Sequence, residues 1–137
     1  MTKSQALVIA GLTAATGIMA NSSSFAFELN GAWTTDVSAC AKIFKKDKDG
    51  KVSIVGGSSI YGDAFVVQSN TIANSSVTCT VKARKDDGPV HHVVAVCAPG
   101  NVALSTFQFS YRVKSDSSIV RIFPGVEELD VTYGRCF

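Results

Sequence analysis

The sequence predicts an all-β domain, most simply a small antiparallel up-and-down barrel of about eight strands, with a β-sandwich as the alternative. Two observations favour this fold class: apolar residues alternate with polar ones in several short runs, and turn signals separate these runs every ten to fifteen residues. Eight strands of about nine residues with eight connections of about four use roughly 104 residues. This nearly exhausts a domain that we expect to span 27–137.

Residues 1–26 are expected to be a signal peptide rather than part of the domain. A short polar start with Lys3 precedes a mostly apolar stretch, 6–19, and Ser24-Phe25-Ala26 has the small-x-small pattern of a cleavage site. The apolar stretch is shorter than the roughly 20 residues of a membrane-spanning helix. We therefore expect cleavage after Ala26, no stable membrane anchor, and a periplasmic or secreted protein.

The clearest strand signal is the alternation of Phe107, Phe109, Tyr111 and Val113 with polar residues. This period of two predicts a strand with one buried face. Similar, shorter patterns follow the chain in order, at 40–45, 52–55, 64–68, 77–83, 91–98, 118–123 and 131–137.

Glycine, asparagine, aspartate and serine clusters mark the connections between these strands. Outside the leader no window has a helical stripe, although a single helical turn fits at 36–39 or at 124–129. The expected turns lie at 47–50, 56–59, 69–70, 86–89, 99–101 and 115–118.

The four cysteines predict two disulfides, because export exposes them to an oxidising compartment and a small core benefits from cross-links. Cys79 and Cys97 are equidistant from Gly88, so a simple hairpin would place them face to face, and Cys40 would then pair with Cys136. The rival pairing, Cys40 with Cys79 and Cys97 with Cys136, stays open.

The segment Leu29-Asn30-Gly31-Ala32-Trp33 favours the barrel over the sandwich. A Gly-x-Trp at the entrance of the first strand resembles the calycin group, which includes lipocalins, avidins and small periplasmic protease inhibitors. The resemblance implies that Trp33 plugs one end of a barrel. The periplasmic inhibitors typically carry one disulfide, and the four cysteines here depart from that pattern.

Three functions follow as hypotheses. The first is a non-enzymatic binding protein for a small apolar ligand or an extracytoplasmic protein, with Trp33, Phe107, Phe109 and Tyr111 as candidate ligand-binding residues. The second is a structural or envelope-interaction protein with a filled core. The third, implied by the resemblance, is a protease inhibitor that inserts residues 27–29 into its target.

Catalytic, metal-binding and nucleic-acid-binding functions have little support in the sequence. No nucleophile elbow is present, no two cysteines form a Cys-x-x-Cys pair, and the adjacent His91 and His92 would point to opposite faces of a strand. A formal net charge of +2 lacks the basic excess typical of nucleic-acid binding. We therefore expect no catalytic residue, no metal and no cofactor, and the sequence does not set the oligomeric state.

Lysines are concentrated in one short segment that is otherwise turn-like. Five of them lie within ten residues, at positions 42, 45, 46, 48 and 51, and Lys82, Arg84 and Lys85 form a second group. We interpret them mainly as charges that keep edge strands from associating, with an anionic polymer or lipid surface as the functional alternative.

Overall fold

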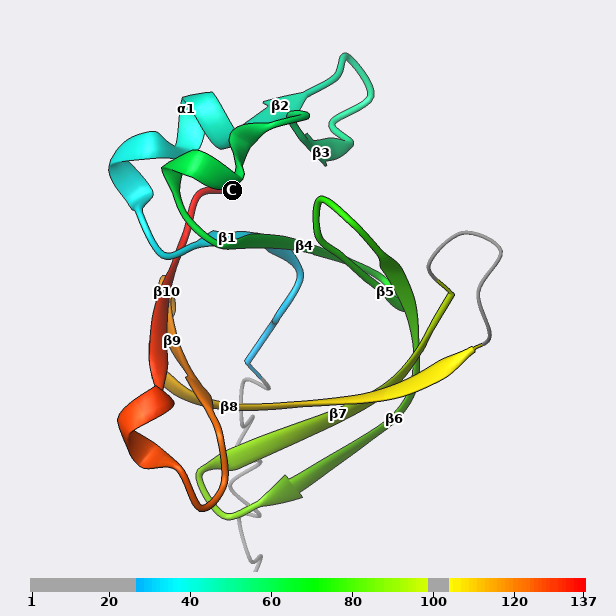
Figure 1. The fold of residues 1–137 in the computed structure, drawn as a ribbon, viewed down its shortest axis with the longest axis vertical. Coiled ribbons are helices and arrows are strands. Elements are labelled where there is room, and N and C mark those ends of the chain that lie inside the picture. Colours follow the sequence, from blue (N-terminus) through cyan, green and yellow to red (C-terminus); the bar gives the residue numbers. More distant parts are fainter. Residues whose placement is uncertain (1–26, 99–103) are drawn as a thin grey trace, which may run out of the picture.

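The chain forms a closed antiparallel barrel of eight strands with a small extension packed on its outer surface (Figure 1). This computed structural model describes residues 27–98 and 104–137. The strands follow one another around the barrel in the order β1, β10, β9, β8, β7, β6, β5, β4, and β4 pairs with β1 to close the ring. The predicted barrel is confirmed, and the sandwich alternative is wrong.

The three central strands β6, β7 and β8 are the longest of the barrel, and the other five have three to five residues. Their bounds are β1 Gly31–Thr34, β4 Ala64–Gln68, β5 Thr71–Ala73, β6 Thr78–Asp87, β7 Val90–Cys97, β8 Ser105–Ser115, β9 Ser118–Ile122 and β10 Val131–Arg135. The pattern of Phe107, Phe109 and Tyr111 lies on β8 as predicted. All neighbouring strands are antiparallel. Because β4 pairs with β1 and closes the ring, none of these strands is a free edge.

The barrel has two ends of different character. At the closed end, residues 27–30 lead into β1, and β10 finishes at Arg135. At the open end β4 begins with Ala64, β7 finishes with Cys97 and β9 finishes with Ile122.

Large apolar side chains fill the interior near the closed end. Trp33 is fully buried, its indole Nε1 donates a hydrogen bond to the Leu29 carbonyl at 2.9 Å, and its ring stacks on Phe65. Around it lies one continuous core cluster: Leu29, Phe65, Val67, Ile72, Val81, Val93, Phe109, Tyr111, Ile119 and Tyr133. Much of the barrel is therefore filled by its own side chains.

Arg135 fastens the segment before β1 to the closed end. Its guanidinium donates to the carbonyl of Asn30 and to that of Glu28, each at 2.6 Å, and its Nε donates to the Asp116 carbonyl at 3.1 Å. The same guanidinium lies over the Trp33 ring, 4.4 Å from its centre. The thin blue segment that crosses the ring in Figure 1 is thus held in place, and Leu29 is 1% exposed.

Residues 36–62 form the extension outside the barrel, and here one strand prediction is wrong. The segment 40–45 was expected to be a strand, but Val37–Ala39 (η1) and Cys40–Ile43 (α1) are helical, and only Phe44–Lys46 (β2) is extended. Asp36 explains the difference, because its carboxylate caps the first turn by accepting from the Ser38 amide at 2.9 Å. The strand β2 pairs with Val52–Ile54 (β3) in a separate sheet, followed by Ser58–Tyr61 (η2).

The extension covers the outer face of β1 and β4. A second core cluster joins Ala32, Ala64 and Val66 of the barrel to Ile43, Phe44 and Val52 of the extension. As a result, β4 is buried on both faces, which explains its unbroken apolar sequence from Ala64 to Val67.

The remaining local predictions have mixed outcomes. Both expected helical turns form, at Val37–Ala39 and at Glu127–Leu129 (η3). The turn at 69–70 is also present, but β5 after it was not predicted. The turn at 99–101 and the leader at 1–26 lie outside the described residues.

Both disulfides of the preferred pairing are present: Cys40 bonds to Cys136, and Cys79 bonds to Cys97. The first bond was expected to link two strands. Instead it ties α1 of the extension to the residue after β10. The second joins directly opposed residues of β6 and β7. A register shift between Val81 and Ala83 is essential for this, because the pairing near the turn, Asp87 with Val90, would otherwise bring Cys79 opposite Ala98.

Candidate ligand-binding site

A pocket of about 110 Å³ opens at the open end of the barrel. Its walls come from seven of the eight barrel strands and the turns beside them, so the ring itself shapes it. The apolar lining consists of Ala64, Phe65, Ile72, Val77, Phe107, Phe109 and the Cys79–Cys97 disulfide, and the polar lining consists of Asp63, Asn74, Arg121 and Tyr133. A largely apolar pocket with a few convergent polar groups is typical of a small-molecule site.

Tyr133 and Asp63 form the fixed polar pair of the pocket. The Tyr133 hydroxyl donates a hydrogen bond to Asp63 Oδ2, while Asp63 Oδ1 accepts from the Ala64 amide at 3.0 Å. Burial of Tyr133 and, next, its bond to the carboxylate raise the pKa of the phenol to about 12, and Arg121 partly offsets this rise. The tyrosine therefore stays protonated at neutral pH and both carboxylate oxygens are engaged.

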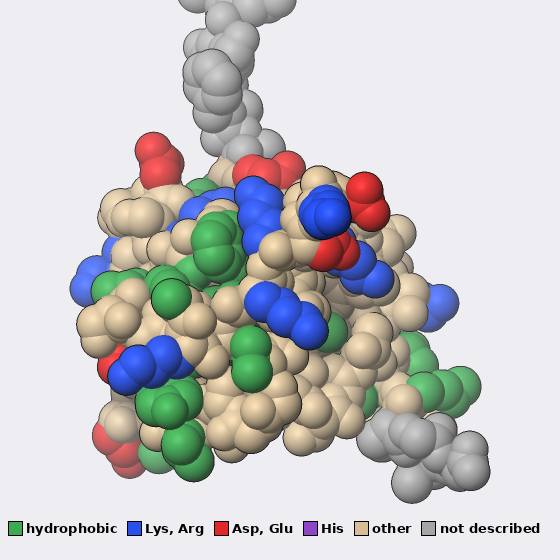
Figure 2. Space-filling model, turned by 90° about the horizontal axis from the view of Figure 1, so that it is seen from above, with side chains coloured by type: hydrophobic (Ala, Val, Ile, Leu, Met, Phe, Trp, Pro, Cys, Tyr) green, Lys and Arg blue, Asp and Glu red, His purple; other side chains and the backbone are tan. Residues whose placement is uncertain are grey.

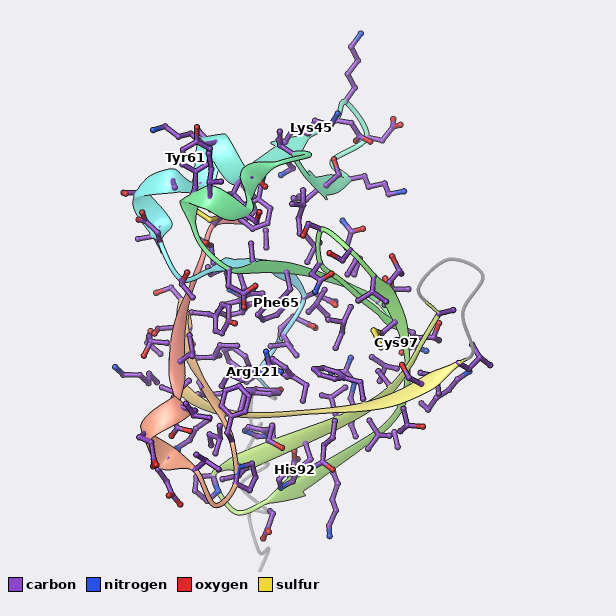
Figure 3. All side chains as sticks on the ribbon, viewed as in Figure 1. Lys45, Tyr61, Phe65, His92, Cys97 and Arg121 are labelled. Carbon is purple, nitrogen blue, oxygen red and sulfur yellow. A yellow bond between two sulfur atoms is a disulfide. The ribbon has the colours of Figure 1, made fainter. Side chains whose placement is uncertain are left out.

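Arg121 extends from β9 into the pocket among aromatic rings. It is two residues after the buried Ile119, so both side chains point into the barrel. Its guanidinium carbon lies 4.7 Å from the ring centre of Phe123, 5.3 Å from that of Phe109 and 5.4 Å from that of Phe107. Figure 3 shows Arg121 and Phe65 within the ring of strands and Cys97 on the side of the ring opposite β9.

The other large hollows lie elsewhere on the molecule. One of about 420 Å³ lies at the closed end beside Phe27, Arg84, Asp86, His91 and Tyr111. Two more, of about 430 and 460 Å³, lie between the β2–β3 sheet and the outer face of β4. The walls of these depressions carry a larger share of polar surface, whereas the pocket at the open end has mainly apolar walls.

The four predicted ligand-binding residues divide between the two ends. Phe107 and Phe109 line the pocket at the open end. Tyr111 lines the depression at the closed end, and Trp33 belongs to the core without lining any of these hollows. The site also includes three polar residues that the sequence analysis did not single out, Asp63, Arg121 and Tyr133. For Arg121 the available signal was its place two residues after Ile119 in a predicted strand.

His91 and His92 lie on opposite faces of β7, as expected from their adjacency. His91 Nδ1 is 2.7 Å from Asp86 Oδ1 and its ring stacks on Tyr111, whereas His92 Nδ1 is 2.8 Å from the Ser110 hydroxyl. Both imidazoles are partly buried. Neither lines the pocket at the open end.

The lysines of the extension lie on an exposed face together with several apolar side chains. Figure 2 views this face and shows blue basic side chains with green hydrophobic ones between them. Val37 is 57% exposed and Ile60 is 79% exposed, and the Lys42 ammonium lies 5.0 Å from the ring centre of Tyr61.

Comparisons with protein-family models, with curated proteins and with solved structures found no match to this chain. Across residues 27–98 and 104–137 there is no helix long and apolar enough to cross a membrane. Within the same residues, histidine, cysteine and acidic side chains form no group of three that could hold a metal ion.

Proposed function

We propose that this protein is an exported, non-enzymatic binding protein that holds a small, largely apolar ligand in the open end of its barrel. The observation that carries the proposal is the difference between the two ends. Residues 27–30 and Arg135 cover one end, where the hollow has mixed polar and apolar walls, while the other end keeps a pocket of about 110 Å³ with mainly apolar walls.

The size of the pocket limits the ligand to a small molecule. Its volume is of the same order as the cavity of about 150 Å³ that binds benzene in an engineered protein core. The walls are mainly apolar and belong to paired strands, so the site is formed before a ligand arrives. A ring or a short branched chain would fill it.

Two disulfides in a domain of this size support a location outside the cytoplasm, where such bonds form and persist. The inhibitor hypothesis gains no such support. It needs residues 27–29 to enter a protease, whereas Leu29 is buried and Phe27 packs against Trp33 with ring centres 6.1 Å apart.

A second candidate function, attachment to an anionic envelope surface, is favoured by the face that combines Lys42 and its neighbouring lysines with exposed Val37 and Ile60. Retention on vesicles of anionic lipid at low salt tests it. Loss of retention when Lys42, Lys45 and Lys46 are changed to glutamine would support this function, and failure of the unaltered protein to be retained would contradict it.

Native mass spectrometry of the protein purified from its own exported fraction tests the proposed function. We expect a mature chain that starts at Phe27, is lighter by four hydrogens and carries a small-molecule adduct. The variant Val77→Trp fills the pocket and should lose the adduct. Val96→Trp, whose side chain points outward from β7, is the matched control and should keep it.

Two results would contradict the proposal. The first is an unaltered protein that is always free of adducts. The second is an adduct that survives Val77→Trp, because it would then be bound somewhere other than the open end.

A further inference from the structure

We propose that Arg121 is the anion-binding residue of the pocket and that the ligand is a small monocarboxylate with an apolar body about the size of one ring. This inference rests on the proposed function and specifies the chemistry of its ligand. It follows from the surroundings of the guanidinium, from the rest of the pocket's charge and from the pocket's volume.

No carboxylate of the protein neutralises Arg121. All eleven acidic residues of the chain lie within the described ranges, since residues 1–26 and 99–103 contain neither aspartate nor glutamate. The ion pairs among the described residues join Asp86 to His91 and Asp130 to Arg112, and none involves Arg121. The positive charge in the pocket therefore has no partner of opposite charge in direct contact.

Asp63 is the one acidic residue that lines the pocket, and its oxygens are already engaged. Oδ2 accepts from Tyr133 and Oδ1 accepts from the Ala64 amide. The Asp63 carbonyl is engaged as well, because it accepts from the Thr35 amide at 3.0 Å and from the Thr34 hydroxyl at 3.2 Å. These bonds hold Asp63 at the rim of the pocket, and its carboxylate forms no direct ion pair with Arg121.

Arg135 provides an internal comparison at the closed end. Both arginines point into the barrel and both lie over aromatic rings. Arg135 donates three hydrogen bonds to backbone carbonyls, of Glu28, Asn30 and Asp116. Arg121 donates none to a backbone carbonyl or a carboxylate of the described residues. The first arginine is thus a structural fastening. The second contacts the Tyr133 hydroxyl and keeps its further donors for an acceptor that the described residues do not supply.

The rings around Arg121 stabilise its charge but offer no hydrogen-bond acceptor. Phe107, Phe109 and Phe123 attract the cation through their faces and hold the guanidinium in position. A planar guanidinium with free donors binds a carboxylate through two parallel hydrogen bonds, and such bonds are stronger where aromatic walls exclude water. A ligand carboxylate therefore fits a guanidinium that contacts the Tyr133 hydroxyl but pairs with no carboxylate of the described residues.

The pocket's charge and size narrow the ligand further. Arg121 is the single cation among the lining residues and the Asp63 carboxylate lies in the same lining, so a ligand with two negative charges, such as a phosphate monoester, would meet an excess of negative charge. The volume of about 110 Å³ leaves room for a ring or a short branched chain but not for a long acyl chain. One carboxylate on such a body satisfies both limits.

Isothermal titration with three probes of one shape tests the inference: benzoate, benzyl alcohol and benzylamine. We expect benzoate to bind the unaltered protein about tenfold or more tighter than benzyl alcohol, since a hydrogen bond to a charged group contributes about 1.5–3 kcal/mol. Benzylamine, which carries the opposite charge, should bind more weakly than the alcohol.

The variant Arg121→Gln tests whether Arg121 causes the preference for benzoate over benzyl alcohol. The affinity ratio of benzoate to benzyl alcohol should fall to about one in this variant. Arg112→Gln removes a partly exposed arginine on the neighbouring strand that does not line the pocket, and the ratio there should stay as in the unaltered protein. If Arg121→Gln fails to fold, the order of the three probes on the unaltered protein still decides the question.

The possible failures are distinguishable. Equal binding of benzoate and benzyl alcohol would overturn the inference and leave the proposed function intact. A benzoate preference that persists in Arg121→Gln would also overturn it. Failure of all three probes to bind would count against the inference and the proposed function together.

Discussion

Gly31 lies where no other residue fits without a shift of the backbone. Its φ is +140°, and a Cβ added there would lie 2.5 Å from the carbonyl oxygen of Phe137. The contact arises because the C-terminal residues pair with β1: the Ala32 amide donates to Phe137, and the Cys136 amide donates to Ala32. The close approach of the C-terminal residues to β1 thus requires a glycine at position 31, two residues before Trp33.

We expect Gly31→Ala to lower the free energy of unfolding by about 2–4 kcal/mol, because it combines an unfavourable φ with a backbone clash. Urea unfolding followed by the fluorescence of Trp33, the one tryptophan of the chain, measures the change. Gly56→Ala is the control, since a Cβ at Gly56 meets nothing within 4 Å. Equal effects of the two substitutions would contradict this account of Gly31.

Tyr133 should make stability depend on pH in the alkaline range. Its pKa rises from 10.0 to about 12 in the folded protein, so the native state holds the proton more tightly than the unfolded state. The corresponding stabilisation is fully present below about pH 10 and is lost as the pH rises towards about 12.

Urea unfolding at several pH values between these limits should show a falling free energy of unfolding, with a smaller fall in Tyr133→Phe. Burial also raises the pKa of Tyr111, so part of the fall should persist in the variant. An identical fall in the two proteins would show that the Tyr133 phenol is not responsible.

The sequence identified some site residues and missed others for a physical reason. The aromatic side chains of β8 were found because alternation marks a buried face, and Phe107 and Phe109 do line the pocket. Arg121 and Asp63 were missed because a charge inside a barrel breaks that alternation and resembles an exposed residue in the sequence. Their proximity depends on the closure of the ring, which brings the start of β4 close to β9 and β10.

At the scale of the elements, the disulfides stabilise the fold unequally. Cys40 and Cys136 are separated by 96 residues, whereas Cys79 and Cys97 are separated by 18. The chain-entropy model assigns about 4.7 kcal/mol to a loop near 100 residues and about 3 kcal/mol to one near 15. The long bond also holds the extension to the end of the barrel sequence.

Urea unfolding of two double variants tests this order. Cys40→Ala with Cys136→Ala should lose more stability than Cys79→Ala with Cys97→Ala, by about 1–2 kcal/mol on the same model. The opposite order would mean that local packing in the β6–β7 hairpin outweighs the loop entropy.

The predicted elements agree with the observed ones where the runs are long and fail where they are short. The strands β3, β4 and β6 to β10 are all recovered within a few residues. The four residues of β1 and the three of β5 are too few to show a period, and they hold their places by pairing with neighbours. The expected strands at 40–45 and 52–55 leave the barrel, because the capped turn at Asp36 directs the chain outward.

For the molecule as a whole, the arithmetic of length and turn spacing was enough to predict a closed ring of eight strands, although not which segments compose it. The side chains of an eight-stranded barrel can fill its interior completely or leave space for one small ligand. Here residues 27–30 and Arg135 cover the closed end, and the open end keeps a mainly apolar pocket. That asymmetry could not be predicted, because it depends on how side chains from distant strands pack.

The central claim is that the open end of the barrel is a ligand site, and methyl NMR during a titration with benzoate tests it most directly. We expect saturable shifts at Ile72 and Val77, which line the pocket, and little change at Val67 and Ile119, which are buried in the core and do not line it. Shifts confined to Val67 and Ile119, shifts at the outer face alone, or no shift at all would contradict the claim.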